Sequence, residues 1–267
     1  MDLGLAGATA VVTGGSKGMG LAIAQTLAEE GARVAVMARE QGPLDAAAES
    51  LRAAGSPDAV GISVDMNDAE SISAAFAEVA ERWGSLNSLV HTIGPGDGYF
   101  EEMTDGDWES AFGLGTMSGV RSIRAALPSL RQAEWSRIVT FAAHSIQRQN
   151  PRIVAYTASK AALASITKNL SKSLAKDGIL VNCVCPGTIV TASFTENLKE
   201  ILAADGLDAT DPVDVMTWID DNFHQPCDLG RAGLPDEIAS ITTYLASRRN
   251  GYITGATINV DGGSDFI

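Results

Sequence analysis

The sequence predicts one α/β domain, in which helices cover both faces of a parallel sheet of seven strands. Short apolar runs alternate along the chain with longer segments whose apolar residues recur at helical spacing. The 267 residues, 45% of them hydrophobic, are sufficient to bury both faces of such a sheet. No internal repeat, low-complexity tract or linker divides the chain, so we expect a single domain over residues 1–267.

The predicted elements follow one another in a regular order. Strands are predicted near residues 8–13, 32–38, 58–64, 86–93, 136–142, 179–185 and 255–260. Helices are predicted near residues 18–30, 42–54, 68–83, 105–131, 151–176 and 235–247. Because crossovers between parallel strands are right-handed, this alternation predicts a doubly wound sheet.

A long insertion at about 188–230 interrupts the alternation after the sixth strand. Long ordered loops at the carboxyl edge of such sheets are usually lids or binding loops. We therefore expect a substrate loop here, with Trp218 and Phe223 among its candidate substrate contacts. Alternatively, its apolar residues pack the segment down or cover a subunit interface.

A glycine-rich turn follows the first strand. Gly14, Gly18 and Gly20 stand between the apolar run at 8–13 and the helix predicted at 18–30. Without Cβ atoms in the way, backbone N–H groups and the positive end of the helix dipole can approach a pyrophosphate. The turn therefore predicts a nucleotide site, although a turn of this kind can also be an ordinary strand-to-helix connection.

A tyrosine and a lysine lie near the start of the helix predicted at 151–176. Tyr156 and Lys160 are four residues apart, so they share one helix face. An ammonium beside a phenol favours the phenolate, so we expect the pKa of Tyr156 to move from about 10 toward working pH. That shift would make Tyr156 a usable proton donor and acceptor. The alternative is a solvated helix face, and the combination with the glycine turn favours catalysis.

The whole chain resembles the short-chain dehydrogenase/reductase family, in which a TGxxxGxG turn binds NAD or NADP and a YxxxK pair performs acid/base chemistry. Three further landmarks carry the resemblance: Asp65 after the third strand, residues 181–187 after the predicted catalytic helix, and residues 258–263 near the C-terminus. It implies a Rossmann-type fold and hydride transfer between a nicotinamide and a carbonyl or alcohol, with Tyr156 as general acid/base.

The resemblance also implies which residues bind the cofactor. By position these are Gly14, Ser16, Lys17, Gly18, Met19, Gly20, Arg39, Asp65, Met66, Gly94, Tyr156, Lys160, Pro186, Gly187, Ile189 and Thr191. Ala38 stands where NAD-preferring members carry Asp, and Arg39 and Lys17 are cations of the kind that accommodates a 2′-phosphate. We therefore expect NADP(H) rather than NAD(H) as the cofactor.

Two positions depart from the family's catalytic pattern. The serine expected thirteen residues before Tyr156 is Ala143, whose methyl group cannot donate a hydrogen bond to the substrate. Ser145 is our first choice for a substitute catalytic donor and His144 the second, as a substrate contact; both can also be plain loop residues. The expected asparagine is Gly115, which, together with Gly113 and Gly119, should weaken or bend its helix.

The strand that ends near residue 93 shows a third departure. His91-Thr92-Ile93-Gly94 replaces the usual Asn-Asn-Ala-Gly, and Gly94 preserves the close approach of the backbone to the cofactor. We interpret His91 as a hydrogen-bonded structural residue rather than a catalytic base.

These departures leave more than one activity open. Carbonyl reduction with Tyr156 as proton donor is the first interpretation. Reduction of an activated C=C bond is an alternative, because Tyr156 could hold the conjugated carbonyl directly. A catalytically impaired NADP(H)-binding regulatory or scaffold protein is a second alternative, since fold resemblance alone does not establish function.

Composition narrows the class of partner. The balance of 19 Lys+Arg against 33 Asp+Glu gives a net charge of −14, which argues against a nucleic-acid or anionic-membrane surface. With no long apolar stretch, we expect a cytoplasmic protein with a small-molecule substrate and no metal. Cys183 and Cys185 are expected to be small core residues that point to opposite faces of their strand. The resemblance implies a homo-oligomer, a tetramer or a dimer.

Overall fold

The seven strands form one parallel sheet, as predicted. The computed structural model describes residues 1–264. The strands are β1 (Thr9–Thr13), β2 (Arg33–Ala38), β3 (Ala59–Ser63), β4 (Ser88–His91), β5 (Ser136–Phe141), β6 (Ile179–Pro186) and β7 (Thr257–Val260). Their order in the sheet is β3-β2-β1-β4-β5-β6-β7, with every neighbouring pair parallel. The order reverses between β1 and β4, and ligands of such sheets bind outside the carboxyl ends of the strands at this switch point.

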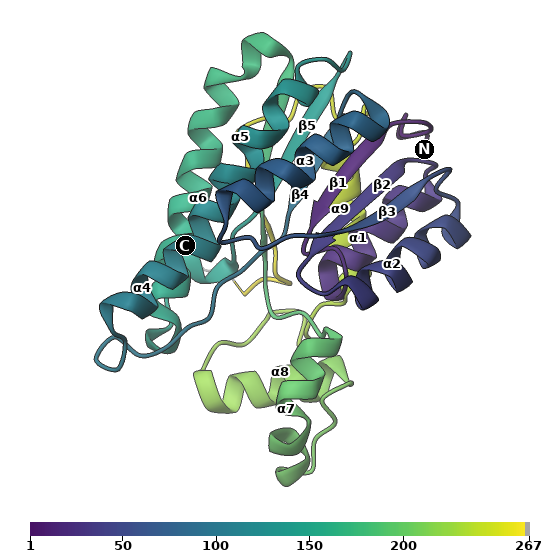
Figure 1. The fold of residues 1–267 in the computed structure, drawn as a ribbon. Helices are drawn as coiled ribbons and strands as arrows, with labels where there is room; N and C mark the ends of the chain where they lie inside the picture. The colour runs from purple at the N-terminus through teal and green to yellow at the C-terminus, as the bar shows by residue number, and fades with distance from the viewer. Residues whose placement is uncertain (265–267) are drawn as a thin grey trace.

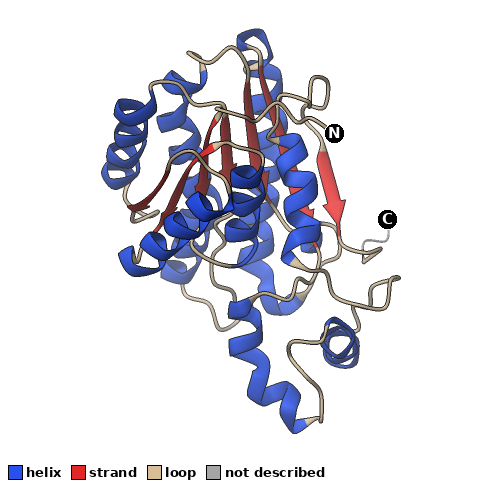
Figure 2. Ribbon diagram, turned by 90° about the vertical axis from the view of Figure 1, so that its right-hand side faces the viewer, coloured by secondary structure: helices blue, strands red, loops and turns tan. Residues whose placement is uncertain are grey.

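Helices cover both faces of the sheet (Figures 1 and 2). The helices are α1 (Gly18–Glu29), α2 (Gln41–Ala54), α3 (Ala69–Trp83), α4 (Asp105–Phe112), α5 (Ser118–Leu130), α6 (Val154–Ser173), α7 (Ala192–Ala204), α8 (Pro212–Phe223) and α9 (Pro235–Leu245). Side chains of α1, α2 and α9 share one buried apolar cluster, whereas those of α3 and α5 share a second cluster on the opposite face.

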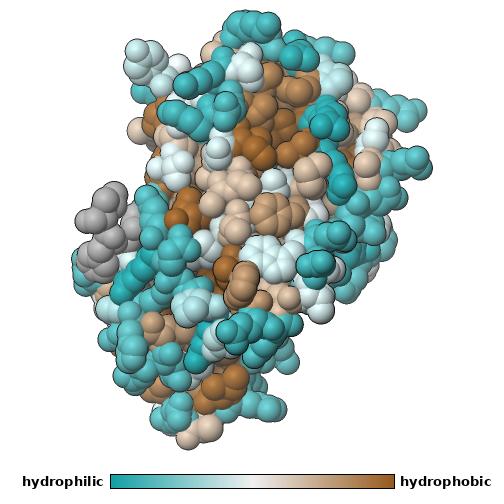
Figure 3. All heavy atoms as spheres, turned by 90° about the vertical axis from the view of Figure 1, so that its left-hand side faces the viewer, coloured by the Kyte–Doolittle hydropathy of each residue, from teal (hydrophilic) through white to brown (hydrophobic). Residues whose placement is uncertain are grey.

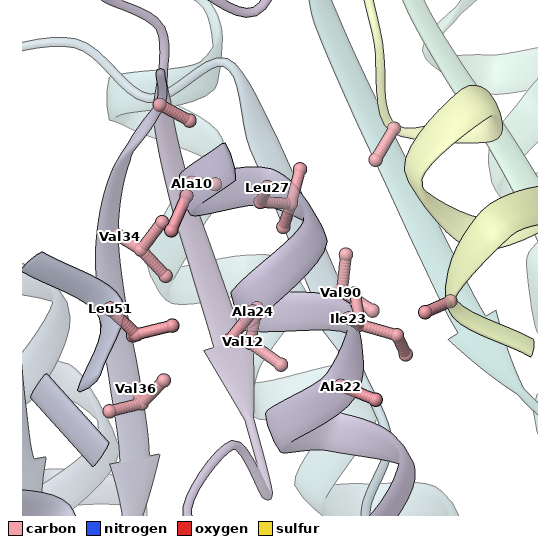
Figure 4. Close-up of a cluster of buried hydrophobic side chains, with 14 of the residues drawn as sticks. Ala10, Val12, Ala22, Ile23, Ala24, Leu27, Val34, Val36, Leu51 and Val90 are labelled. Carbon is pink, nitrogen blue, oxygen red and sulfur yellow. The ribbon is translucent and has the colours of Figure 1, made fainter. Parts of the chain in front are cut away.

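The alternation of strand side chains explains why both faces are filled. Val12 and Val36 belong to the same buried cluster as Ile23 and Leu27 of α1 (Figure 4), whereas Val11 belongs to the cluster on the other face. All five residues of β1 are buried, because helices cover the sheet on both sides. The continuous apolar runs of the sequence are therefore central strands.

The helix predicted at 105–131 is interrupted. A π-helical turn, Gly113–Met117, separates α4 from α5. Two of the three glycines noted in the sequence lie in this turn, where their conformational freedom weakens regular α-helical hydrogen bonding. The expectation that the glycines disturb the helix is confirmed, and the single long helix is corrected to two.

The insertion at 188–230, called the cap segment from here on, is helical rather than a loop. It contains α7 and α8, which lie apart from the sheet in Figure 1. The Thr191 side chain accepts from the Phe194 N–H, and Asp211 caps α8 with Pro212 at its first position. These caps were visible in the sequence and would have predicted both helices.

Cys183 and Cys185 correct a second expectation. They lie on the same face of β6, in one buried cluster with Ala142 and Ala164, because side chains two residues apart in a strand share a face. Both are small core residues, as expected. Among residues 1–264, no helix is long and apolar enough to cross a membrane.

Candidate active site

A cleft of about 460 Å³ opens at the carboxyl edge of the sheet, at the switch point between β1 and β4. Of the predicted cofactor residues, it is lined by Gly14, Ser16, Lys17, Gly18, Met19, Gly20, Arg39, Asp65, Met66, Gly94 and Thr191. Residues that were not predicted as cofactor contacts also line it, namely Ala38, Glu40, Pro43, Val64, Asn67, Thr92, Ile93, Leu114 and Ser193. Five other predicted contacts lie outside its lining, namely Tyr156, Lys160, Pro186, Gly187 and Ile189.

The glycine turn is shaped for a close approach. A Cβ atom at Gly20 would lie 2.2 Å from the carbonyl oxygen of Gly14, and one at Gly14 would lie 2.5 Å from Thr92 Oγ1. Lys17, at the N-cap of α1, makes no side-chain capping bond. The first N–H groups of α1 therefore face the cleft without a side-chain cap, which fits the pyrophosphate of a dinucleotide.

Lys160 lies beside the cleft, next to the lining residues Ile93 and Gly94. Its side chain is buried, and its Nζ donates to the carbonyl oxygens of Ile93 at 2.6 Å and Phe141 at 2.7 Å. Nζ is 5.9 Å from the centre of the Tyr156 ring. A Cβ atom built on Gly94 would lie 3.6 Å from the Tyr156 ring and 3.8 Å from Lys160 Cε. The predicted pair and Gly94 therefore meet in one place.

The expected effect of Lys160 on the tyrosine is not present in this structure. Burial raises the pKa of Tyr156 to about 12, and the negative charge of Asp97 adds to the rise. Burial also lowers the pKa of Lys160 to about 8. The Lys160 ammonium donates to two backbone carbonyls rather than to the phenol, and it loses its charge as the pH rises through about 8. Tyr156 therefore stays protonated at neutral pH.

The two candidate substitutes for the missing serine differ in their surroundings. Ser145 is 2% exposed, and its Oγ accepts a hydrogen bond from Thr157 Oγ1 at 3.1 Å. His144 is partly exposed, and its Nδ1 is 3.2 Å from the carbonyl oxygen of Pro186. Ser145 is therefore directed into the protein, whereas His144 lies at the open carboxyl edge of the sheet.

The space that an asparagine side chain would need at residue 115 is occupied by the side chain of Ser159. A Cβ atom at Gly115 would lie 2.2 Å from Ser159 Oγ and 3.1 Å from Pro95 Cγ. The neighbouring Thr116 donates through Oγ1 to the Ser159 carbonyl at 2.8 Å. The π-helical turn thus packs directly against α6, and the present packing has no room for a side chain at residue 115.

His91 is a structural residue, as the sequence indicated. It is fully buried, with Nδ1 2.8 Å from Thr13 Oγ1 and Nε2 3.0 Å from Ser118 Oγ. Ser118 Oγ donates to the carbonyl of Leu114, so it accepts from His91 Nε2–H, and Nδ1 accepts from Thr13. Burial, together with the charge of Lys160, lowers the pKa of His91 to about 3. A neutral His91 therefore ties β1 to α5.

The two aromatic residues predicted as substrate contacts lie in different surroundings. Trp218 is 9% exposed and packs edge-on against Phe223, with ring centres 5.4 Å apart, inside the apolar cluster of the cap segment. Phe223 also faces Arg152, whose guanidinium carbon lies 4.7 Å from its ring centre. Trp218 is therefore part of a core, whereas Phe223 lies at its edge.

The cap segment is fastened to the loop before α6. Arg148 donates to the carbonyl oxygens of His224 at 3.0 Å, Pro226 at 2.9 Å and Ser264 at 3.0 Å. The sequence reasoning missed this arginine, and also Asp97 and Arg152. Asn150-Pro151, a capping pair directly before the Tyr156 motif, was a signal for the ordered turn that carries Arg152.

The fold and this cleft define a dinucleotide-binding α/β protein with a Tyr-Lys pair. A family model described as "Enoyl-(Acyl carrier protein) reductase" matches residues 14–265. "Dehydrogenase/reductase SDR family member 4" of Caenorhabditis elegans is 32% identical to this chain, and the alignment covers 96% of this chain and 95% of that protein. A 3-oxoacyl-[acyl-carrier-protein] reductase, FabG of Staphylococcus aureus, is also 32% identical, with 96% and 97% covered.

A solved structure agrees over the whole chain. L-Sorbose reductase from Gluconobacter frateurii, complexed with NADPH and L-sorbose, has a TM-score of 0.91 and 31% identity, with 99% of this chain and 98% of that chain covered. The protein belongs to the short-chain dehydrogenase/reductase family of oxidoreductases.

Proposed function

We propose that the protein is an NADP(H)-dependent oxidoreductase that transfers hydride between the nicotinamide and a carbonyl or alcohol substrate. The observation that carries this proposal is the meeting of Gly94, Tyr156 and Lys160 beside the cleft. A phenol that stays protonated and a buried cation are the two groups that such a reaction needs from the protein.

The choice of NADP(H) rests on the end of the cleft near β2. Arg39 and Lys17 line it, Ala38 offers no carboxylate, and both cations are exposed. Charge-assisted hydrogen bonds from Arg39 to a 2′-phosphate would give a clear preference, on the order of 1.5–3 kcal/mol. The similar L-sorbose reductase is complexed with NADPH.

The chain's own residues account for the proton step. The cofactor, when bound, supplies or accepts the hydride. Tyr156, which is protonated at neutral pH, donates its phenolic proton to the substrate oxygen during reduction. Oxidation of an alcohol would start from the phenolate form of Tyr156, which takes up the hydroxyl proton. Lys160 binds the cofactor through its ammonium and orients it. His144, rather than Ser145, is our choice for the second group at the substrate oxygen, because it lies at the open edge of the sheet.

Reduction of an activated C=C bond is the second candidate. Ala143 removes one donor to a carbonyl oxygen, which is costly for carbonyl reduction, on the order of 10²-fold in rate. Tyr156 alone could hold a conjugated carbonyl oxygen while the double bond is reduced. The matching family model carries the description of an enoyl reductase.

We also propose that the protein is a homo-oligomer, with α4, α5 and α6 at an interface. Apolar side chains gather on the face of the molecule that carries α4 and α6 (Figure 3). Phe112 of α4 is 37% exposed and Met117 of the π-helical turn is 38% exposed. Packing this face against a second copy would remove apolar surface from water.

The deciding experiment measures oxidation of NADPH and of NADH with a panel of ketones, aldehydes and enones, for the unmodified protein and Tyr156→Phe. We expect turnover with NADPH that falls at least about 10²-fold in Tyr156→Phe, while NADPH binding is retained. Turnover of enones alone would favour the second candidate. NADPH binding without any turnover would contradict both and indicate a binding protein, and equal efficiency with NADH would overturn the cofactor preference.

A further inference from the structure

We propose that Arg152 selects a substrate that carries a carboxylate at some distance from its reacting carbonyl. The inference rests on the proposed oxidoreductase function, because the inference assumes that a carbonyl substrate reaches Tyr156 along a path beside Arg152. It rests on three features of Arg152: the turn that carries it, the two aromatic rings near its guanidinium, and the guanidinium donors that bond to no group among residues 1–264.

An ordered turn fixes the position of Arg152. Asn150 Oδ1 accepts from the Arg152 N–H at 2.9 Å, and Pro151 sets the first dihedral angle of the 3₁₀ turn Pro151–Ile153. This turn leads directly into α6. Arg152 precedes Tyr156 by four residues, and Tyr156 lies in the first turn of α6.

The Arg152 guanidinium lies near two aromatic rings that come from different segments of the chain. Its guanidinium carbon is 5.9 Å from the ring centre of Tyr99 and 4.7 Å from that of Phe223. Tyr99 belongs to the loop that leaves β4 through Gly94, the residue in contact with Tyr156. Phe223 is the last residue of α8. A substrate that reaches Tyr156 between this loop and the cap segment passes the guanidinium.

The guanidinium of Arg152 is exposed, and its N–H donors are bonded to no group among residues 1–264. Within residues 1–264 its guanidinium makes no hydrogen bond and no ion pair, although the chain holds 33 acidic against 19 basic residues. Arg148, four residues earlier, is bonded to three carbonyls. The two ring contacts involve the positive charge of Arg152 and use none of its five guanidinium N–H donors. These donors form a planar fork that can bind the two oxygens of a carboxylate.

A neighbouring carboxylate limits where the anionic group of the substrate can lie. Asp97 lies three residues after Gly94, whose Cβ position is 3.6 Å from the Tyr156 ring, and its charge adds to the rise in the pKa of the phenol. A carboxylate adjacent to the reacting carbonyl would meet the like charge of Asp97. The two functional groups of the substrate are therefore separated, with the carbonyl at Tyr156 and the carboxylate at Arg152.

The test compares 4-acetylbenzoate with its uncharged methyl ester. We measure kcat/KM for both with NADPH in the unmodified protein, Arg152→Met, Arg152→Lys and Arg249→Met. Arg249 is the control, because its backbone N–H bonds to Leu3 near the amino ends of the strands, at the end of the sheet opposite the site. The ratio of acid to ester within each variant cancels any general loss of activity.

We expect a preference for the acid of at least about tenfold in the unmodified protein and in Arg249→Met, a ratio near one in Arg152→Met, and an intermediate ratio in Arg152→Lys. No preference in the unmodified protein, or a preference that persists in Arg152→Met, would overturn the proposal.

A binding measurement separates this inference from the proposed function. We titrate the NADPH-loaded protein with each compound and follow tryptophan fluorescence, since Trp218 contacts Phe223 beside Arg152. If neither compound is reduced but the acid binds and Arg152→Met abolishes that binding, the inference stands and the proposed reaction fails. If the acid does not bind, the inference fails whatever the activity.

Discussion

The two sides of the active-site region are held by different parts of the chain. On the side of β1 and α1, the shape depends on backbone atoms, because Gly14 and Gly20 leave no space for a Cβ. On the side of the cap segment, side chains hold the structure, with Arg148 and Arg152 fastening α8 to the loop before α6. A close approach of backbone atoms requires glycine at fixed positions, which can be recognised in a sequence. Side-chain packing can be achieved by many combinations of residues, so it leaves no fixed pattern.

The largest expected effect tests the backbone side. Gly20→Ala places a methyl group 2.2 Å from the Gly14 carbonyl, so the turn must open, and we expect NADPH affinity to fall at least about 100-fold. Gly42→Ala is the matched control, because no atom lies within 4 Å of its Cβ position, and it should leave the affinity unchanged. Cofactor fluorescence titration measures both, and wild-type affinity in Gly20→Ala would contradict the close-approach argument.

A smaller effect is expected when the family's asparagine is restored. Gly115→Asn meets Ser159 Oγ at 2.2 Å, and we expect a loss of about 1–3 kcal/mol in the free energy of unfolding. Gly106→Ala, a glycine in α4 whose Cβ position is 3.7 Å from its nearest neighbour, should not be destabilised. Denaturant unfolding gives both values. A Gly115→Asn protein as stable as the parent would show that α6 shifts freely.

The smallest effect concerns the group at the junction of the two sides. Lys160 is charged below its pKa of about 8 and neutral above it, so NADPH affinity should weaken as the pH rises through 8, by up to about tenfold. Tyr156, with a pKa of about 12, does not titrate there. The same dependence should therefore persist in Tyr156→Phe and disappear in Lys160→Met. A transition near pH 10 or above that is lost in Tyr156→Phe would assign it to the phenol.

The sequence was sufficient for the sheet and for most of the cofactor cleft. All seven strands and the residues of the glycine turn were predicted, because hydrophobic periodicity and glycine spacing report directly on buried strands and close backbone approach. The π-helical turn was predicted only as a weakness at Gly113 and Gly115, since the register change depends on packing against Ser159. The pKa of Tyr156 was expected to fall, and burial, which a sequence does not report, raises it.

The substrate side was less predictable. Tyr99, Arg152 and Phe223 are far apart in the sequence and meet only through the folding of the cap segment. No motif marks such a meeting. His144 and Ser145, which are adjacent in the chain, could be told apart only by the direction of their side chains.

The separate apolar cluster of the cap segment has a consequence for how the family diversifies. Leu202, Val215 and Trp218 pack with one another rather than with the two clusters that flank the sheet. Substitutions among them can therefore reshape the cap without disturbing the strands that position Tyr156. A protein built this way can acquire a new specificity through substitutions in this one cluster while the strands and the glycine turn of the redox site stay unchanged.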